Sequence, residues 1–318
     1  MSDTILTRGP GAVDQLLASS LHAYLEKTPV DQVFNKRPAV SKMLSKAKKM
    51  DGGSTIVTNV MYEKNETAAN YDGADVLDIT PQAGYTDTQA EWKQAAVSIS
   101  LIGRLLRQNS GASKVFDIID QKRQQAMDSL EDKVNDNLFA AAVGSKAPES
   151  LVTMILASGT VQGVNSSTSS WWQSTVTTGG SFATQGLSDL RTTYSTLDKK
   201  QPSSRIDMLL STDTVYNYYE GSLTPNTRYA DGETPTGSFS GLKFKDATMF
   251  YDAAATSGVI YMFSTDDLYF VINSGANFTM TEFVKPANQD VKTAQIILMY
   301  QMCTKARRKL GKITSITA

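Results

Sequence analysis

The sequence has few of the side chains that metal sites and many catalytic sites require. Its 318 residues include one cysteine, Cys303, and one histidine, His22. These counts exclude an intrachain disulfide and any zinc site built from several cysteines and histidines. A Ser-His-Asp triad could be built only around His22, which we expect to be a structural histidine. Cys303 lies in the apolar run IILMYQMC, which favours a packed small side chain over a reactive thiol.

Net charge and long apolar runs are also missing. The chain has 31 Lys and Arg against 32 Asp and Glu, a net charge of -1, so it lacks the global basic field that sequence-independent nucleic-acid binding usually needs. Any contact with nucleic acid must be local. No apolar stretch approaches the ~18 residues of a membrane-spanning helix, and the first residues show no signal-peptide pattern. We expect a folded protein kept in a reducing cytoplasm, with no membrane partner.

Motifs for phosphate binding, nucleophilic catalysis and calcium binding are incomplete. The residues GKI at 311–313 have Ile where a phosphate-binding loop needs Ser or Thr, and GSFSG at 237–241 has Phe where a nucleophile elbow needs Ser. The acidic segment DGADVLD lacks the spacing and closing Glu of a calcium loop. We therefore expect no catalytic residue, no metal and no cofactor. Paired carboxylates leave a soluble carboxylate-based hydrolase as an alternative.

Two strand-like segments in the first third of the chain flank a long polar segment. The strand-like runs cover residues 54–65 and 90–106, and the polar segment covers residues 65–88. This pattern predicts a long hairpin with a wide tip. Ordering the backbone costs roughly 1–2 kcal/mol per residue, and an isolated two-stranded hairpin is marginal in water. We therefore expect a second copy of the chain to order the hairpin.

The longest helical pattern follows this hairpin. Ser113 is a suitable N-cap, and one apolar stripe continues through about thirty residues, which at 1.5 Å per residue would span roughly 45 Å. The stripe consists of Val115, Ile119, Met127, Leu130, Val134, Leu138 and Ala141. Such a helix is longer than a compact domain needs.

The remaining chain predicts a mixed α/β section and a return of strands. Residues 144–185 are rich in Gly, Ser and Thr and contain the pair Trp171 and Trp172, expected to be a packing or interface anchor. A helix at 187–197, a strand at 206–211 and a helix ending near Gly221 come next, followed by a polar loop over 223–241. Further strands are expected at 242–250, 259–264, 268–273, 278–286 and 291–316.

Basic residues gather near both ends. The run from Asn35 to Lys49 predicts either a short helix with a solvated basic face or a segment that docks on an acidic surface. A second basic cluster follows the last long strand. The first set is Lys36, Arg37, Lys42 and Lys46, and the second is Arg307, Arg308 and Lys309.

The order of these parts resembles the major capsid protein of tailed bacteriophages. The resemblance covers the whole chain and is carried by the strand-then-helix run IDMLLSTDTVYNYYEG and by the ending GLKFKDATMF to CTKARRKLGKITSI. It implies an α+β HK97-like capsid fold. Its parts would be an N-arm at 1–51, a β-hairpin E-loop at 52–100, a P-domain at 101–143 and 275–318 with a spine helix at 113–142, and an A-domain at 144–274.

The resemblance also implies a function and partners. The chain would assemble with itself into the hexamers and pentamers of an icosahedral head that encloses double-stranded DNA, in the host bacterial cytoplasm, and would reside in the virion. Lys36, Arg37, Lys42 and Lys46, or else Arg307, Arg308 and Lys309, would then face the packaged DNA or acidic neighbours. Portal, scaffolding and cement proteins would be further partners. Met1 precedes the arm by only a few residues, so scaffolding would be a separate protein. Some relatives cross-link through a Lys-Asn isopeptide bond, for which Lys64 is an available donor, although we do not expect that chemistry here.

Inter-subunit contacts are predicted at aromatic and basic residues in and near the hairpin. These residues are Tyr62, Lys64, Tyr71, Tyr85, Trp92, Trp171 and Trp172. Other functions remain open alternatives. An encapsulin-like nanocompartment shell would share the fold, but the long N-arm argues against it; a phage tail or fibre protein would not need the long helix; and a hydrolase would be a monomer with convergent carboxylates in a pocket.

Overall fold

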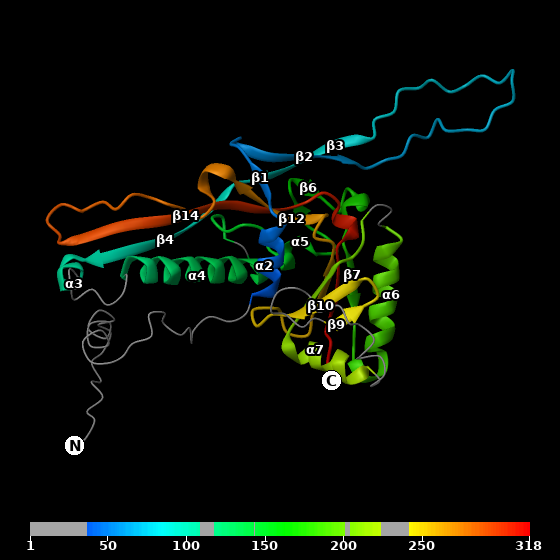
Figure 1. The fold of residues 1–318 in the computed structure, drawn as a ribbon. Helices are drawn as coiled ribbons and strands as arrows, with labels where there is room; N and C mark the ends of the chain where they lie inside the picture. Colours follow the sequence, from blue (N-terminus) through cyan, green and yellow to red (C-terminus); the bar gives the residue numbers. More distant parts are fainter. Residues whose placement is uncertain (1–36, 109–117, 143, 201–203, 224–241) are drawn as a thin grey trace. The chain divides into compact units, whose positions relative to one another are not determined.

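The computed structural model describes residues 37–108, 118–142, 144–200, 204–223 and 242–318 (Figure 1). The predicted helix near 13–25, Lys36 and most of the polar loop at 223–241 lie outside these ranges. Two compact units divide the chain: the described part of unit 1 lies in Ala95–Leu130 and Phe278–Ile297, and unit 2 comprises Asn35–Gln94, Glu131–Asn277 and Leu298–Ala318. Within the described ranges, no helix is both long and apolar enough to cross a membrane.

Unit 1 is built on the pairing of two long strands. β4 (Lys93–Ile102) pairs with β14 (Val291–Thr304), and the short strand β13 (Thr279–Met280) pairs antiparallel with the other edge of β14. Side chains along β4 alternate, with Ile99 and Leu101 buried between exposed neighbours, as the period of a strand requires. α3 (Gly103–Gln108) follows, and Arg107 in it forms an ion pair with Asp290 just before β14.

The predicted long helix is present as α4 (Ile118–Phe139), about 33 Å long at 1.5 Å per residue. The predicted start at 113–117 lies outside the described residues, and residues 140–142 are not helical. The stripe is confirmed at Val134 and Leu138, which are at most 2% exposed, whereas Ala141, predicted on the same stripe, is exposed beyond the helix end.

A six-stranded sheet forms one part of unit 2, in the order β7-β15-β11-β8-β10-β9. The strands are β7 (Thr175–Thr178), β8 (Met208–Ser211), β9 (Leu242–Phe244), β10 (Ala247–Tyr251), β11 (Ile260–Phe263) and β15 (Gly311–Thr314). Two predicted helices accompany it, α6 (Leu187–Asp198) and α7 (Asp213–Ser222). β8 and β11 are buried at every position, which explains their uninterrupted apolar sequences.

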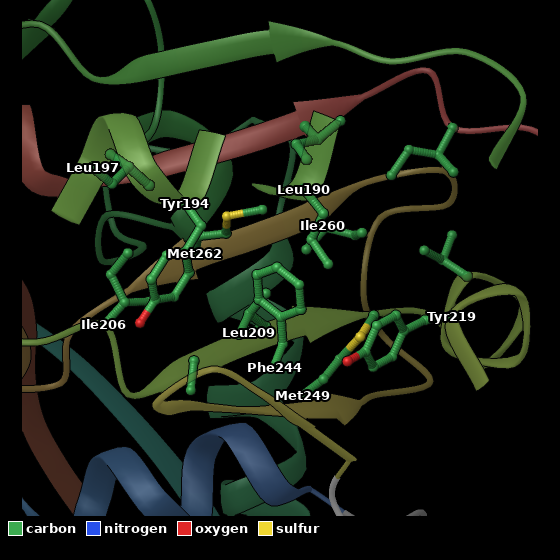
Figure 2. Close-up of a cluster of buried hydrophobic side chains, with 14 of the residues drawn as sticks. Leu190, Tyr194, Leu197, Ile206, Leu209, Tyr219, Phe244, Met249, Ile260 and Met262 are labelled. Atoms are coloured by element: carbon green, nitrogen blue, oxygen red, sulfur yellow. The ribbon is translucent and has the colours of Figure 1, made fainter. Parts of the chain in front are cut away.

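The core of this sheet is apolar and tightly packed (Figure 2). Leu190, Tyr194 and Leu197 form one face of α6, at the spacing the sequence predicts, and pack with Ile260 and Met262 of β11. A glycine in β15 permits the close approach of α6. A Cβ at Gly311 would lie 2.5 Å from the Cδ1 atom of Leu197, so any side chain there would force helix and strand apart.

A second strand group in unit 2 joins the N-terminal region to the end of the chain. β1 (Lys48–Met50) pairs in parallel with β12 (Leu268–Asn273), and β12 pairs antiparallel with β14, Leu268 opposite Thr304. β12 therefore lies beside β14, and β15 lies between β7 and β11 in the six-stranded sheet.

Short elements connect these parts. They are α2 (Pro38–Ser45), α5 (Leu151–Met154), β5 (Thr160–Val161), β6 (Val164–Asn165), η2 (Ser170–Trp172), η3 (Phe182–Gly186), η4 (Ser274–Ala276) and η5 (Arg307–Lys309). The predicted strand at 278–286 is reduced to β13 and one isolated bridge between Val284 and Thr293.

Candidate assembly surfaces

The predicted hairpin is present, but its second strand is not the one expected. β2 (Thr55–Met61) pairs antiparallel with β3 (Tyr85–Glu91), with Thr55 opposite Glu91 and Met61 opposite Tyr85. The polar segment expected to form the tip therefore contains most of β3. The run at 90–106, expected to close the hairpin, mostly forms β4, which pairs with β14 instead.

One face of the hairpin is packed and the other is open. Ile56 and Ala90, opposite each other, are buried against Tyr269, Val271 and Cys303, which belong to β12 and β14 of unit 2. The opposite face carries Val57, Met61 and Tyr85, which are 50%, 66% and 70% exposed. The hairpin is thus a two-stranded ribbon with an unpartnered face that includes large apolar side chains.

Backbone contacts hold the base of the hairpin. Gln89 donates its backbone N–H to the carbonyl oxygen of Gln162 at 2.9 Å, and the Gln301 side-chain amide donates to the carbonyl oxygen of Glu91 at 2.9 Å. Predicted contact residue Trp92 is half-buried and packs against the cluster of Ile56 and Ala90. Cys303 is buried, which raises the pKa of its thiol to about 12. The prediction that Cys303 is a packed small side chain, and not a reactive thiol, is therefore confirmed.

Aromatic stacking fixes the point where the strands end. The rings of Tyr62 and Trp171 are stacked, with centroids 5.4 Å apart, and the Tyr62 hydroxyl donates to the carbonyl oxygen of Ala83. Trp172 is 1% exposed, and its indole N–H donates to the carbonyl oxygen of Val161 at 3.1 Å. Trp172 therefore packs inside its own subunit, which is the packing role predicted as one alternative for the tryptophan pair.

Beyond Tyr62 the hairpin tip is exposed. Tyr71 is 65% exposed, Lys64 is also exposed, and the apolar residues Val76 and Ile79 are 99% and 91% exposed. Local turns shape this segment: the Asp78 carboxylate accepts hydrogen bonds from the Thr80 N–H and hydroxyl, which lowers the pKa of Asp78. The tip is therefore an acidic, partly apolar segment exposed to solvent in the isolated chain.

A pocket of about 310 Å³ lies beside the end of the hairpin ladder. Its lining combines aromatic side chains with cations, all from unit 2: Asn59, Val60, Met61, Tyr62, Trp171, Trp172, Asp267, Lys305, Ala306, Arg308 and Lys309. Lys309 is already engaged, because its ammonium lies 3.1 Å from an Asp267 carboxylate oxygen and that carboxylate is 7% exposed. Lys305 and Arg308 are exposed.

The N-terminal basic run docks on acidic groups of its own chain. In α2, Pro38, Ala39, Val40 and Met43 are buried. The Lys46 ammonium lies 3.3 Å from an Asp207 carboxylate oxygen and 3.7 Å from one of Asp266, while Lys42 donates to the Asp207 carbonyl oxygen at 3.1 Å. Burial is the main cause of the lowered Lys42 pKa. Arg37 lies 4.0 Å from Asp132. Of the two alternatives for this run, docking on an acidic surface is the one observed.

Arg307 is a structural residue. Its side chain is 0% exposed, and its guanidinium donates to the carbonyl oxygens of Met154, Leu156 and Gly159 at 2.9–3.0 Å. Burial lowers the pKa of Arg307 to about 10, so it remains a cation at neutral pH. The prediction that Arg307 faces DNA is therefore wrong, and of the predicted cluster Arg308 alone is exposed.

Across the described ranges, no group of three or more His, Cys, Asp or Glu side chains could hold a metal ion. The chemistry that this arrangement offers is association: an open hairpin face, an exposed acidic tip and a pocket with aromatic and cationic walls. Sequence reasoning found the hairpin and its aromatics. It missed the pocket, whose residues come from four separate stretches of the chain.

No protein-family model matches the sequence, and no curated protein matches it. Solved structures match nearly the whole chain. The capsid asymmetric unit of Cyanophage A-1(L) has a TM-score of 0.71 at 12% identity and covers 94% of this chain and 98% of that chain. The capsid of a native GTA particle has a TM-score of 0.61 at 9% identity and covers 92% of this chain and 96% of that chain. The holo-SrpI encapsulin complex from Synechococcus elongatus PCC 7942 has a TM-score of 0.61 at 8% identity and covers 95% of each chain. The chain therefore has the α+β, HK97-like capsid fold that its sequence predicts.

Proposed function

We propose that this chain is the structural subunit of a closed icosahedral head, assembled from hexamers and pentamers of its own copies, and not an enzyme. The observation that carries the proposal is the end-to-end similarity in fold to a cyanophage capsid subunit, covering 94% of this chain. Identical copies that meet around local rotation axes close into a shell instead of growing as a filament.

The exposed hairpin supports the same proposal. Val76, Leu77 and Ile79 in the tip and Met61 and Tyr85 at the end of the ladder are all more than half exposed in the isolated chain. Burying one such side chain stabilises an interface by roughly 1.5–3 kcal/mol. Several large apolar side chains exposed on one hairpin are typical of a surface that meets a partner.

The contents of the shell are part of the proposal. A phage head would enclose double-stranded DNA and would use portal, scaffolding and cement proteins, with assembly in the host cytoplasm. An encapsulin-like shell around cargo proteins is the second candidate, and it is supported by the similarity in fold to the SrpI encapsulin. The higher TM-score of the cyanophage capsid, 0.71 against 0.61, supports the phage head.

Electron microscopy of the purified full-length chain tests this function. We expect closed shells of uniform diameter at high protein concentration, and a chain that stays monomeric under all assembly conditions would overturn the proposal. Removing residues 65–82, which lie outside the β2–β3 ladder, should leave a folded subunit that does not form shells. The ratio of absorbance at nucleic-acid and protein wavelengths in particles from the natural host then distinguishes DNA from protein cargo.

A further inference from the structure

We propose that the acidic tip of the hairpin, residues 72–79, docks into the pocket at the base of the hairpin of a second copy. This docking site will be called the base pocket, lined by the residues given above around Met61, Trp171 and Arg308. The inference rests on the proposed function, because it names the surface that one subunit offers to the next within the shell.

Charge complementarity is the first support. The tip segment DGADVLDI carries three carboxylates, Asp72, Asp75 and Asp78, and no cation. The base pocket offers Lys305 and Arg308, both exposed, and Arg308 forms no ion pair with any other described residue. The one carboxylate in the pocket wall, Asp267, is neutralised by Lys309. The pocket is therefore cationic overall and suits an acidic segment.

Apolar complementarity is the second support. Beside its carboxylates the tip carries Val76, Leu77 and Ile79, which are 99%, 54% and 91% exposed. The base pocket presents the side of the stacked pair Tyr62 and Trp171 together with Met61, which is 66% exposed. Aromatic side chains and methionine suit the adaptable apolar contacts of protein interfaces. A volume of about 310 Å³ lies at the small end of binding pockets and suits a few side chains of a peptide segment.

The occupant must come from another copy. Residues 63–83 contribute nothing to the lining of the base pocket of their own chain, and the tip side chains remain exposed in it. The turns that shape the tip are formed locally, through Asp75 to the Asp72 N–H and through Asp78 to Thr80. A segment shaped in advance loses less entropy when it docks.

Site-directed cross-linking tests which copy supplies the tip. Ile79→Cys is introduced into a tagged full-length chain and Met61→Cys into an untagged one, and the two are assembled together and oxidised. Cys303 is buried and does not compete. We expect a disulfide-linked species that contains both chains. A chain that carries both substitutions and cross-links only within itself, or shells that form without any such link, would overturn the docking while leaving the proposed function intact.

Charge exchange provides a second, independent readout. Lys305→Glu with Arg308→Glu should lower the apparent assembly constant by at least about tenfold, because like charges then face each other. Adding Asp75→Lys and Asp78→Lys to the same chain should restore assembly. The matched control, Arg191→Glu in α6 with Lys133→Glu in α4, makes the same change in net charge at exposed residues that do not line the pocket. Failure of the restoring pair in subunits that fold normally would contradict the docking. Absence of shells from the wild-type chain would instead contradict the proposed function.

Discussion

Tyr62 stacks on Trp171 with an angle of 28° between the ring planes. The contact joins the residue that follows β2 to the helical turn η2, more than a hundred positions later in the chain. Together with the buried pair of Ile56 and Ala90, it attaches the hairpin base to its own subunit and leaves the outer face and the tip exposed. The contacts that hold the hairpin to its own subunit are thus concentrated at its base, and the exposed tip and outer face are the parts proposed to meet a neighbouring copy.

Replacing Tyr62 by alanine should therefore destabilise the subunit. An aromatic pair contributes about 0.5–1.5 kcal/mol beyond the area that it buries, so we expect the free energy of unfolding to fall by at least that amount in urea denaturation. Tyr85→Ala is the matched control, since Tyr85 is 70% exposed. It should change stability by less than about 0.5 kcal/mol yet reduce shell yield. Equal effects of the two variants on unfolding would contradict this separation of roles.

Arg307 should be among the residues that the fold tolerates least. Arg307→Ala removes the donors of three carbonyl oxygens, those of Met154, Leu156 and Gly159, so we expect a loss of roughly 3 kcal/mol or more in the free energy of unfolding. Arg307→Lys keeps the charge but lacks the planar fork and should recover only part of it. Arg308→Ala, an exposed neighbour, should leave unfolding unchanged. A stable Arg307→Ala subunit with altered DNA retention would restore the DNA-facing interpretation.

Periodic segments of this fold could be predicted from sequence because local pattern and burial agree in them. The face of α6 at Leu190, Tyr194 and Leu197 and the apolar strand β8 are such cases. The partner of β2 could not be predicted in this way. β3 reads YTDTQAE and exposes alternate polar residues, so the more apolar run that follows it has the stronger strand pattern. Long-range packing of Ala90 against Tyr269 and Val271 decides the pairing instead.

The basic clusters show the same limit. A run such as RRK predicts solvent exposure, yet the burial of Arg307 depends on carbonyl oxygens about 150 positions earlier in the chain. Lys46 is likewise engaged by Asp207, 161 residues away. The base pocket also combines distant stretches, so no local motif signals it. Sequence reasoning located the hairpin and the basic clusters, but not which of their charges the subunit itself uses.

The thiol of Cys303 should be unreactive in the native subunit. Burial raises the pKa of Cys303 to about 12, so very little of the reactive thiolate is present at pH 8. We expect no reaction with a colorimetric thiol reagent under native conditions and one equivalent after denaturation. An engineered Ile79→Cys on the exposed tip serves as the positive control and should react at once. Rapid modification of native wild-type protein would show that the β12 and β14 packing opens.

Asp252 should stabilise the folded subunit less as pH rises. Asp252 is 1% exposed, and burial is the main cause that raises its pKa above 3.8. Its Oδ1 atom accepts from the Asn135 amide at 2.9 Å, while its Oδ2 atom and the Asn135 Oδ1 atom have no hydrogen-bond partner among the described residues. The folded state therefore binds the Asp252 proton more tightly than the unfolded chain does. The stabilisation from this proton is complete below pH 3.8 and is lost as pH rises through the raised pKa.

The variant Asp252→Asn cannot ionise, so its free energy of unfolding relative to wild type should increase across that pH window and stay constant above it. Urea denaturation at a series of pH values measures the difference, with the exposed Asp198→Asn as control. A difference that does not change with pH would show that the Asp252 carboxyl titrates as it does in the unfolded chain.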